Sequence, residues 1–272
     1  MPDGTDPLTR IAVTSLYGSK LALDQHNLSN LDIVLFDIPD IGCRSYTYLW
    51  TMTHVMEACT AHGKQLIIAD RPNPLSGSLQ LAEGPRLDEP HCSSFIGRWD
   101  IPVRHACTFG ELTRYLSATR PSLTGLKLDV IHCQHWRRTM FHPEWNPSFV
   151  PTSPAIPACE SALLYPGLGL QEATNISEGR GTATPFRIAG APWINGPLLA
   201  AHVNEYHPDG VHVRRVNITP AEGKYLGQQC SGIMLHVHNP AVFRPVGLGW
   251  LLIRLVQQLH PLISTGRPTL RM

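Results

Sequence analysis

The sequence lacks the patterns that mark membrane, secreted and nucleic-acid-binding proteins. No apolar run reaches the roughly 20 residues that a membrane-spanning helix needs. The first ten residues, MPDGTDPLTR, contain no apolar core of a secretory signal. The formal net charge is +1, so electrostatics gives no reason to expect nucleic acid or an anionic membrane as a partner. Taken alone, these features predict a soluble protein with reduced cysteines.

Signatures of metal, nucleotide and serine-nucleophile chemistry are also missing. The seven cysteines are scattered and form no Cys-x-x-Cys pair, so neither a zinc site nor a disulfide framework is indicated. The 14 histidines form no His-Glu-x-x-His motif. A P-loop lysine motif, a dinucleotide glycine fingerprint and a Gly-x-Ser-x-Gly elbow are all absent from the sequence. We therefore expect no metal and no cofactor, and nucleotide binding or serine hydrolysis fits the chain poorly.

The first half of the sequence alternates apolar strands with helices. Residues 31–37 and 65–70 are short apolar runs that each end in an aspartate, as expected of buried parallel strands. Residues 45–62 between them predict a helix, and Gly63 is placed to end it. The apolar face of this helix is predicted to consist of Leu49, Met52, Met56 and Cys59. Strand, helix and strand together predict a βαβ unit with a right-handed crossover.

The same alternation continues to about residue 131 and then breaks. Thr108 and Glu111 form a capping box that predicts the start of a second helix, and residues 126–131 predict a third strand. Ligands of such an open α/β sheet bind beyond the carboxyl ends of its strands. Prolines are dense between residues 136 and 167, at positions 143, 147, 151, 154, 157 and 166. They predict an irregular linker in place of a long regular element.

The second half predicts a smaller α/β domain. The expected elements are a helix at 196–206, strands at 210–216 and 230–238, and a helix at 246–259 with its leucines on one stripe. We therefore divide the chain into an open-sheet domain at 1–157 and a smaller α/β domain at 158–272.

Polar residues follow the two predicted strands of the βαβ unit. The segment after the first strand carries Asp37, Asp40, Arg44 and Tyr46, which could bind a polar ligand at the edge of the sheet. The alternative is that Asp37 and Arg44 pair to brace the loop. Asp70 and Arg71 end the second strand and could either orient a ligand or stabilise the turn.

The richest concentration of chemistry lies between Glu172 and Thr182. Within these eleven residues are two glutamates, an asparagine, three hydroxyl side chains and an arginine that lies between two glycines. The ligand candidates here are Glu172, Asn175, Glu178 and Arg180. Either glutamate could act as a general acid or base, although one could merely pair with Arg180. Glu83 is a further acidic candidate, in the Glu-Gly-Pro sequence of a long loop.

Taken together, these segments resemble the exo-β-N-acetylmuramidase family, glycoside hydrolases that were formerly a domain of unknown function. The resemblance runs in consistent order from about residue 13 to about residue 260. Its matching stretches are Ser15-Leu-Tyr-Gly18, Phe36–Tyr48, Ala69-Asp-Arg-Pro-Asn-Pro74, Glu83-Gly-Pro85, Ile101-Pro-Val-Arg-His105, Trp136-Arg137, Ser153-Pro154, Tyr165-Pro-Gly167, Thr174–Thr182 and Gly190-Ala-Pro-Trp193.

The resemblance implies release of N-acetylmuramic acid from the non-reducing end of peptidoglycan fragments. It also implies a Rossmann-like N-terminal domain joined to a smaller C-terminal domain, with the site in the cleft between them. Family members begin with a further βα segment that carries a Ser-Pro-Glu-His-Gly motif, and this motif does not occur here. We therefore expect a shortened member, whose oligomeric state and localisation the sequence leaves open.

The chemistry that the resemblance implies suggests a specific role for each polar residue. A glycosidase usually needs two carboxyl groups, roughly 5–5.5 Å apart for retention and 6.5–9.5 Å apart for inversion. Glu172, Glu178 and Glu83 are the candidates for that pair. In a substrate-assisted route the acetamide of the sugar attacks instead. Asp40, Tyr46 or Asn175 could then polarise that acetamide.

The lactyl carboxylate of muramic acid requires a cation, for which Arg180, Arg71 and Arg44 are candidates. The predicted partners are thus peptidoglycan-derived saccharides. Two other functions stay open: non-catalytic binding of muropeptides or amino sugars, and hydrolysis or transfer of another carboxylated or phosphorylated sugar.

Overall fold

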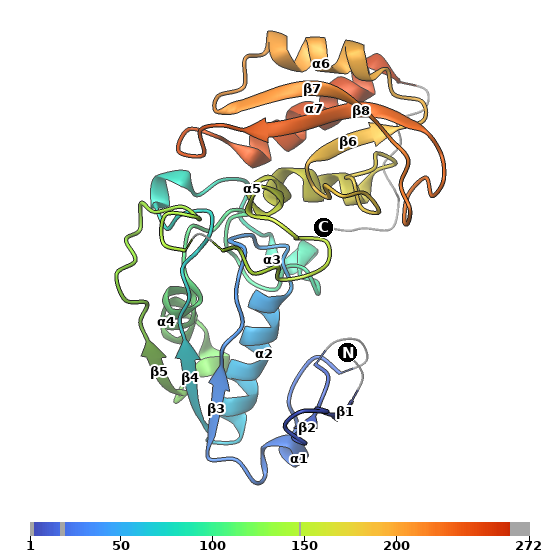
Figure 1. Cartoon of the computed structure of the whole chain (residues 1–272). Coiled ribbons are helices and arrows are strands. Elements are labelled where there is room, and N and C mark those ends of the chain that lie inside the picture. The colour runs from blue at the N-terminus through green and yellow to red at the C-terminus, as the bar shows by residue number, and fades with distance from the viewer. Residues whose placement is uncertain (1–2, 17–19, 147, 262–272) are drawn as a thin grey trace. The chain divides into compact units, whose positions relative to one another are not determined.

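The computed structural model describes residues 3–16, 20–146 and 148–261. Contacts within the chain group it into two compact units, neither of which is continuous in sequence (Figure 1). Unit 1 comprises Met1–Pro39, Thr47–Arg71 and Thr108–Gln134, and unit 2 comprises Asp40–Tyr46, Pro72–Cys107 and His135–Met272. The domain boundary between residues 157 and 158 stays a prediction.

Unit 1 is built around a parallel sheet in the order β3-β4-β5. These strands are β3 (Ile33–Phe36), β4 (Gln65–Ala69) and β5 (Lys127–Ile131). Helix α2 (Tyr48–Ala61) connects β3 to β4, and α4 (Phe109–Thr119) lies between β4 and β5 in the chain. An open parallel sheet with intervening helices confirms the predicted Rossmann-like α/β class, and α2 begins three residues later than expected.

Local sequence explains the two long helices of unit 1, α2 and α4. The four residues predicted for the apolar face of α2 are all fully buried: Leu49, Met52, Met56 and Cys59. Gly63 follows the helix with a φ of +63°, a left-handed conformation that glycine adopts without steric cost. The capping box of α4 is also confirmed, because the Thr108 side chain accepts from the Glu111 N–H while the Glu111 carboxylate accepts from the Thr108 N–H.

Several short elements complete unit 1. Strands β1 (Gly4–Thr5) and β2 (Ala12–Val13) pair antiparallel, α1 is Gln25–Leu28 and the 3-10 helix η2 is Pro121–Leu123. One face of the parallel sheet is only partly covered by the described residues, since Leu35 is 61% and Ile131 60% exposed. Among the described residues no helix is both long enough and apolar enough to cross a membrane.

Unit 2 contains an antiparallel sheet in the order β6-β8-β7. Its strands are β6 (Ile188–Ala191), β7 (Val211–Ile218) and β8 (Cys230–Val237), and its long helices are α5 (Cys159–Leu168), α6 (Gly196–Glu205) and α7 (Pro245–Leu259). Helix α6 packs on β7 and β8, while α5 packs against α7. The remaining short helices are η1 (Leu79–Leu81), α3 (Glu89–Cys92) and η3 (Gly169–Ala173). Helices α6 and α7 and strands β7 and β8 were each predicted to within two residues at both ends. Strand β6 was not predicted.

The proline-rich segment holds one correction. We predicted no long regular element between residues 136 and 167, yet α5 runs from Cys159 to Leu168 with Pro166 inside it. A proline near the last turn removes only one helical hydrogen bond. Tertiary packing supports the helix, because a Cβ on Gly167 would overlap the Pro245 carbonyl oxygen and one on Gly249 would overlap Gly167. The close packing of α5 against α7 at these glycines therefore outweighs the preference of the prolines for irregular structure.

Candidate functional site

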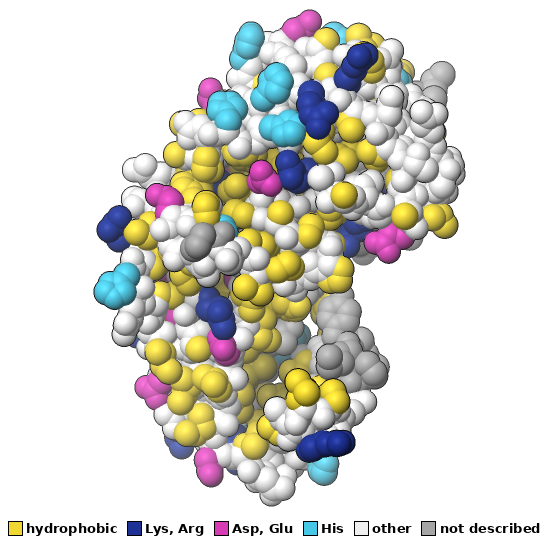
Figure 2. All heavy atoms as spheres, in the orientation of Figure 1, with side chains coloured by type: hydrophobic (Ala, Val, Ile, Leu, Met, Phe, Trp, Pro, Cys, Tyr) yellow, Lys and Arg dark blue, Asp and Glu magenta, His cyan; other side chains and the backbone are white. Residues whose placement is uncertain are grey.

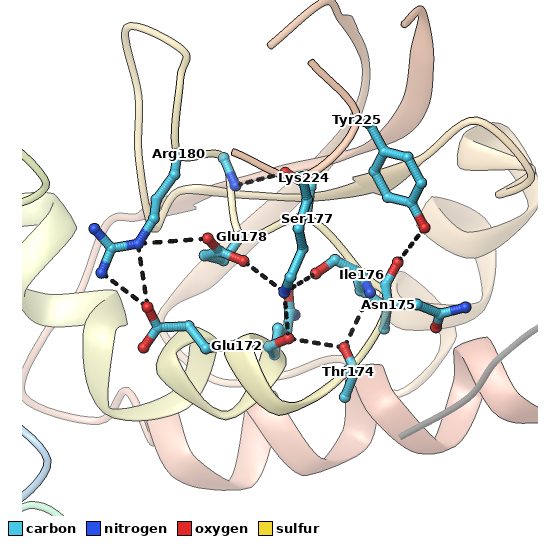
Figure 3. A network of polar contacts seen from close by, with 11 residues as sticks. Glu172, Thr174, Asn175, Ile176, Ser177, Glu178, Arg180, Lys224 and Tyr225 are labelled. Carbon is cyan, nitrogen blue, oxygen red and sulfur yellow. Dashed lines mark hydrogen bonds and ion pairs between the residues drawn. The ribbon is translucent and has the colours of Figure 1, made fainter. Parts of the chain in front are cut away.

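The segment Glu172–Thr182 lies in unit 2 and forms a hydrogen-bonded network with the loop that carries Lys224 (Figure 3). It begins in the 3-10 helix η3 and ends in a tight turn at Gly179 and Gly181. The two glycines have φ values of +86° and +76°, and a Cβ on Gly181 would collide with the backbone of Glu222. Glycine is therefore required at this turn, which holds Arg180 in place.

Glu178 is buried at the centre of this network. Its Oε2 accepts a hydrogen bond of 3.0 Å from the Lys224 ammonium, and its side chain is only 5% exposed. The same ammonium donates to the carbonyl oxygens of Gln171 and Ile176, both at 2.8 Å. Three acceptors thus match the three N–H donors of Lys224. This geometry is typical of a buried, compensated ion pair that fixes the loop.

Arg180 joins Glu178 to Glu172. Its Nη2 and Nε donate to Glu172 Oε1 at 2.8 and 3.1 Å, and its Nε lies 3.5 Å from Glu178 Oε1. The guanidinium also lies over the ring of Phe186, with its central carbon 4.9 Å from the ring centroid. Burial lowers the pKa of Arg180, but Glu172 and then Glu178 outweigh burial, so the pKa is raised. Arg180 therefore interacts with both carboxylates.

Sequence reasoning missed three residues that shape this loop. Lys224 is one of them. The others are Tyr225, whose hydroxyl donates to the Asn175 carbonyl oxygen at 2.5 Å, and Trp193, whose Nε1 donates to the Tyr225 hydroxyl at 3.0 Å. Trp193 lies in one of the stretches that match the family, and this was the only indication in the sequence that it belongs to the site. Lys224 and Tyr225 lie in a turn region with no recognisable pattern.

A cavity of about 270 Å³ opens beside Glu172 within unit 2. It is lined by Arg44, Ser45, Leu87, Cys92, Ser94, Ile96, Gly97, Val103, Tyr165, Pro166, Gly169, Leu170 and Glu172. Its walls are largely apolar, and its two charged lining residues are Arg44 and Glu172. Small-molecule sites have this character, with mostly apolar walls and a few placed polar groups, at a typical volume of about 300–1,000 Å³. Neither Glu178 nor Arg180 lines the cavity.

Arg44 reaches the cavity from the segment that follows β3. Its Nη1 donates to the carbonyl oxygens of Pro85 and Ile101 at 2.8 and 2.6 Å. Its backbone N–H donates to the Val103 carbonyl oxygen at 2.7 Å. Burial lowers the pKa of Arg44. An arginine guanidinium nevertheless keeps its positive charge in proteins. These bonds fix the position of the side chain at the cavity wall.

Two further candidates on this segment, Asp40 and Tyr46, are buried and hydrogen-bonded. Asp40 is 8% exposed, with its Oδ2 at 3.0 Å from the Gly42 N–H and 3.1 Å from His105 Nε2. The Tyr46 hydroxyl donates to Thr152 Oγ1 at 2.7 Å, and its ring packs edge-on against Tyr165. Burial raises the pKa of Tyr165 well above its ordinary value. Tyr165 itself lines the cavity, so Tyr46 stands behind a lining residue.

Glu83 contacts the start of helix α7. Its Oε1 accepts from the Gly247 N–H at 2.6 Å, in the first turn of α7. Its backbone pairs with Arg104, a buried arginine that donates to the carbonyl oxygens of Leu75 and Phe243. Burial lowers the pKa of Arg104 to about 10, while the charge of Glu83 opposes that shift. Glu83 thus caps a helix N-terminus, where a negative charge is favoured.

The strand-tip candidates of unit 1 form a separate cluster. Arg71 Nη2 lies 2.6 Å from Asp37 Oδ1, and both side chains are about half exposed. Asp70 accepts from the Gly110 N–H and the Thr108 hydroxyl, both at 2.8 Å, and from the Arg71 N–H at 3.0 Å. Asp70 therefore fastens the first turn of α4 to the end of β4. Among the described residues no group of three His, Cys, Asp or Glu side chains could hold a metal ion.

Comparison with known proteins agrees with the resemblance. The family model described as the N-terminal domain of the exo-β-N-acetylmuramidase NamZ matches residues 1–160, and the model of its C-terminal domain matches residues 163–268. The chain is 39% identical over 265 residues to the peptidoglycan β-N-acetylmuramidase NamZ of Bacillus subtilis strain 168. That match covers 96% of this chain and 63% of the relative, so the chain spans less than two thirds of that protein.

Two solved structures are similar as well. Both are DUF1343 family proteins from Bacteroides fragilis NCTC 9343. One is 30% identical with a TM-score of 0.89, and the match covers 94% of this chain and 66% of that one. The other is 27% identical with a TM-score of 0.75, covering 97% and 69%. The family and the fold predicted from the sequence are thus confirmed.

Proposed function

Because the chain belongs to the NamZ family of exo-β-N-acetylmuramidases, we propose that it is a glycosidase that releases terminal N-acetylmuramic acid from peptidoglycan fragments. The observation that carries this proposal is the match of both family domains, in order, over nearly the whole chain. The named relative is a peptidoglycan β-N-acetylmuramidase. The cavity beside Glu172 has mostly apolar walls and two charged side chains, which suits a small polar ligand that carries apolar groups.

Arg44 is our choice of cation for the lactyl carboxylate of muramic acid. Of the three arginine candidates, it is the one that lines the cavity. Neither Arg71 nor Arg180 is among the residues that line this cavity. An arginine can hold a carboxylate through two parallel N–H donors, which favours this residue type for recognising the acid that glucosamine lacks. The apolar lining residues Leu87 and Leu170 would receive the methyl groups of the sugar substituents.

Glu172 is our choice of reacting carboxylate. It is the only candidate glutamate among the residues that line the cavity in the described part of the chain. Paired with Arg180, it is suited to stabilise positive charge on the sugar ring or to accept a proton from water. Glu178 and Glu83 fit positioning roles better, since one balances Lys224 and the other caps α7. Asp37, Asp40, Tyr46, Asp70 and Asn175 stay predictions as binding residues.

Turnover of a chromogenic β-N-acetylmuramide tests the proposal, with the matching β-N-acetylglucosaminide as the control substrate. We expect release of the chromophore from the muramide and much slower release from the glucosaminide. Absence of turnover for both would contradict the proposed activity. Titration calorimetry with N-acetylmuramic acid then separates the outcomes, because binding without turnover would indicate a non-catalytic amino-sugar-binding protein.

A further inference from the structure

A second cavity lies elsewhere in unit 2, at the first turn of helix α7. Its volume is about 240 Å³, and it is lined by Tyr206, Pro208, Asp209, Val242, Phe243, Arg244, Gly247, Leu248 and Leu251. None of these residues lines the cavity beside Glu172. The proposed glycosidase chemistry therefore assigns this second cavity no role.

The walls of the second cavity are fixed by backbone contacts. Gly210 has a φ of +72°, and a Cβ there would overlap the Asn239 carbonyl oxygen. The Gly210 carbonyl oxygen accepts from the N–H groups of His238 and Asn239, at 2.9 and 3.1 Å. On the other wall Phe243 is 1% exposed, and its carbonyl oxygen accepts from buried Arg104 at 3.3 Å. Such a cavity exists before a ligand arrives, which reduces the ordering cost of binding.

The cavity carries one charge of each sign. Asp209 lies on the turn before β7, and Arg244 lies just before α7. Within the described ranges, neither side chain makes a hydrogen bond, and neither has an ion-pair partner within 4.0 Å, including the other. Neighbouring polar groups are already engaged, since the Tyr206 hydroxyl accepts from Arg254 and the Gly247 N–H donates to Glu83. A carboxylate and a guanidinium are thus left for a ligand.

Apolar side chains make up most of the remaining lining. Phe243 and Leu248 are buried, and Pro208, Val242 and Leu251 complete the apolar set. A ligand that matches this wall carries a cation, an anion and a short apolar body. A neutral sugar offers neither charge, and a phosphate-rich chain would be repelled by Asp209.

We propose that the second cavity binds a zwitterionic short peptide, with its ammonium group at Asp209 and its carboxylate at Arg244. Charge-assisted hydrogen bonds to both ends would be stronger than neutral ones. Nearby Arg104 adds positive potential on the side of Arg244, because the two arginines lie close enough for Arg244 to lower the pKa of Arg104. This proposal does not depend on the proposed glycosidase activity.

Titration of the full chain with the dipeptide dialanine tests the proposal, followed by calorimetry or by chemical shifts. Two matched probes each lack one charge: N-acetyl-dialanine has no ammonium group, and dialanine amide has no carboxylate. Loss of a charged hydrogen bond weakens binding by about tenfold or more. We therefore expect each capped probe to bind at least about tenfold more weakly. Equal affinities for the three probes, or no binding of dialanine at millimolar concentration, would overturn the proposal.

Two variants assign the charges to their residues. With Asp209→Asn, dialanine and its N-acetyl form should bind alike, and with Arg244→Gln, dialanine and its amide should bind alike. Asp32→Asn and Arg215→Gln are the controls, since both residues are exposed and lie outside the cavity. If the cavity variants retain wild-type affinity for dialanine, the peptide binds elsewhere and the assignment is wrong. Circular dichroism spectra and thermal unfolding that match the wild type would show that both cavity variants are folded.

Discussion

Two polar clusters of this protein satisfy the same sequence criteria and differ in what surrounds them. The unit 1 cluster consists of Asp37, Asp70 and Arg71 at the ends of β3 and β4. In it, Asp70 is fully engaged by the first turn of α4, and the other two residues form a half-exposed ion pair. The unit 2 cluster lies in the loop 172–182 and the Lys224 turn. It contains a buried ion pair and also a glutamate, Glu172, that faces a cavity.

The difference shows that a concentration of polar residues is not enough to define a site. Asp70 and Glu178 are both acidic and both lie in sequences typical of binding loops, yet backbone and side-chain donors of the protein occupy them. A binding role needs polar atoms that face space for a ligand. Glu172 and Arg44 meet that condition at the first cavity. The predictions below therefore contrast residues that line the cavity with residues that do not line it.

The largest effect is expected for Glu172→Gln. The amide keeps the size of the side chain and can still accept from Arg180, but it loses the charge and the ability to exchange a proton. We expect kcat for the muramide to fall roughly 10²- to 10⁴-fold, the usual contribution of a positioned acid or base. Glu205→Gln, an exposed glutamate on α6 that pairs with His202, is the matched control. Wild-type kcat in the Glu172 variant would exclude Glu172 as the reacting carboxylate.

Lys224→Met should have the largest effect on stability. It leaves Glu178 buried with only the distant contact from Arg180, and breaking a buried ion pair costs about 3–5 kcal/mol. Urea denaturation measures the free energy of unfolding. Lys127→Met, on the exposed edge strand β5, is the control and should change it by less than about 0.5 kcal/mol. Equal stability of the two variants would mean that the network does not support the loop.

Sequence patterns predicted the elements of both units where local and tertiary signals agree. The apolar face of α2, the capping box of α4 and the parallel order of β3 and β4 all follow from short-range patterns. Helix α5 was missed because its support comes from the glycine contact with α7, about 80 residues later in the chain. Strand β6 was missed because its four residues are all apolar and show no alternation with polar ones.

The sequence predicted which residues form the candidate site. It did not predict which of them are paired with other protein groups and which line the cavity. Sequence alone could place Glu172, Glu178 and Arg180 in one segment. It could not show that Lys224 forms an ion pair with Glu178, because Lys224 lies 46 residues away in a loop without a recognisable pattern. It also could not separate Arg44 from the other arginines, since the carbonyl oxygens that fix Arg44 belong to Pro85 and Ile101.

A smaller stability change is expected for Asp70→Ala. The substitution removes the acceptor for Gly110 and Thr108 at the start of α4. Loss of such a helix-capping contact costs about 0.5–2 kcal/mol. Asp37→Ala breaks only an exposed ion pair, which is worth about 0–1 kcal/mol. Thermal unfolding of the two variants compares them directly, and a larger loss for Asp37 would reverse our interpretation of this cluster.

The smallest effect concerns two thiols near the first cavity. Burial raises the pKa of Cys43 to about 11, so only about one molecule in a thousand carries the reactive thiolate at pH 8. Native Cys43 should therefore resist iodoacetamide until the pH approaches 11. Cys92 lines the cavity and is half-buried, so we expect it to react first. Mass spectrometry of the alkylated peptides gives the order, and faster labelling of Cys43 would contradict the burial of its segment.

The preference for muramide over glucosaminide in Arg44→Gln tests the central claim most directly. The claim is that the cavity lined by Arg44 and Glu172 binds the lactyl carboxylate. We predict that the ratio of kcat/KM for the two substrates falls at least about tenfold in this variant, because one charged hydrogen bond to the carboxylate is lost. Arg71→Gln, in the unit 1 cluster, should leave the ratio unchanged. An unchanged ratio in Arg44→Gln together with a reduced ratio in Arg71→Gln would contradict the account.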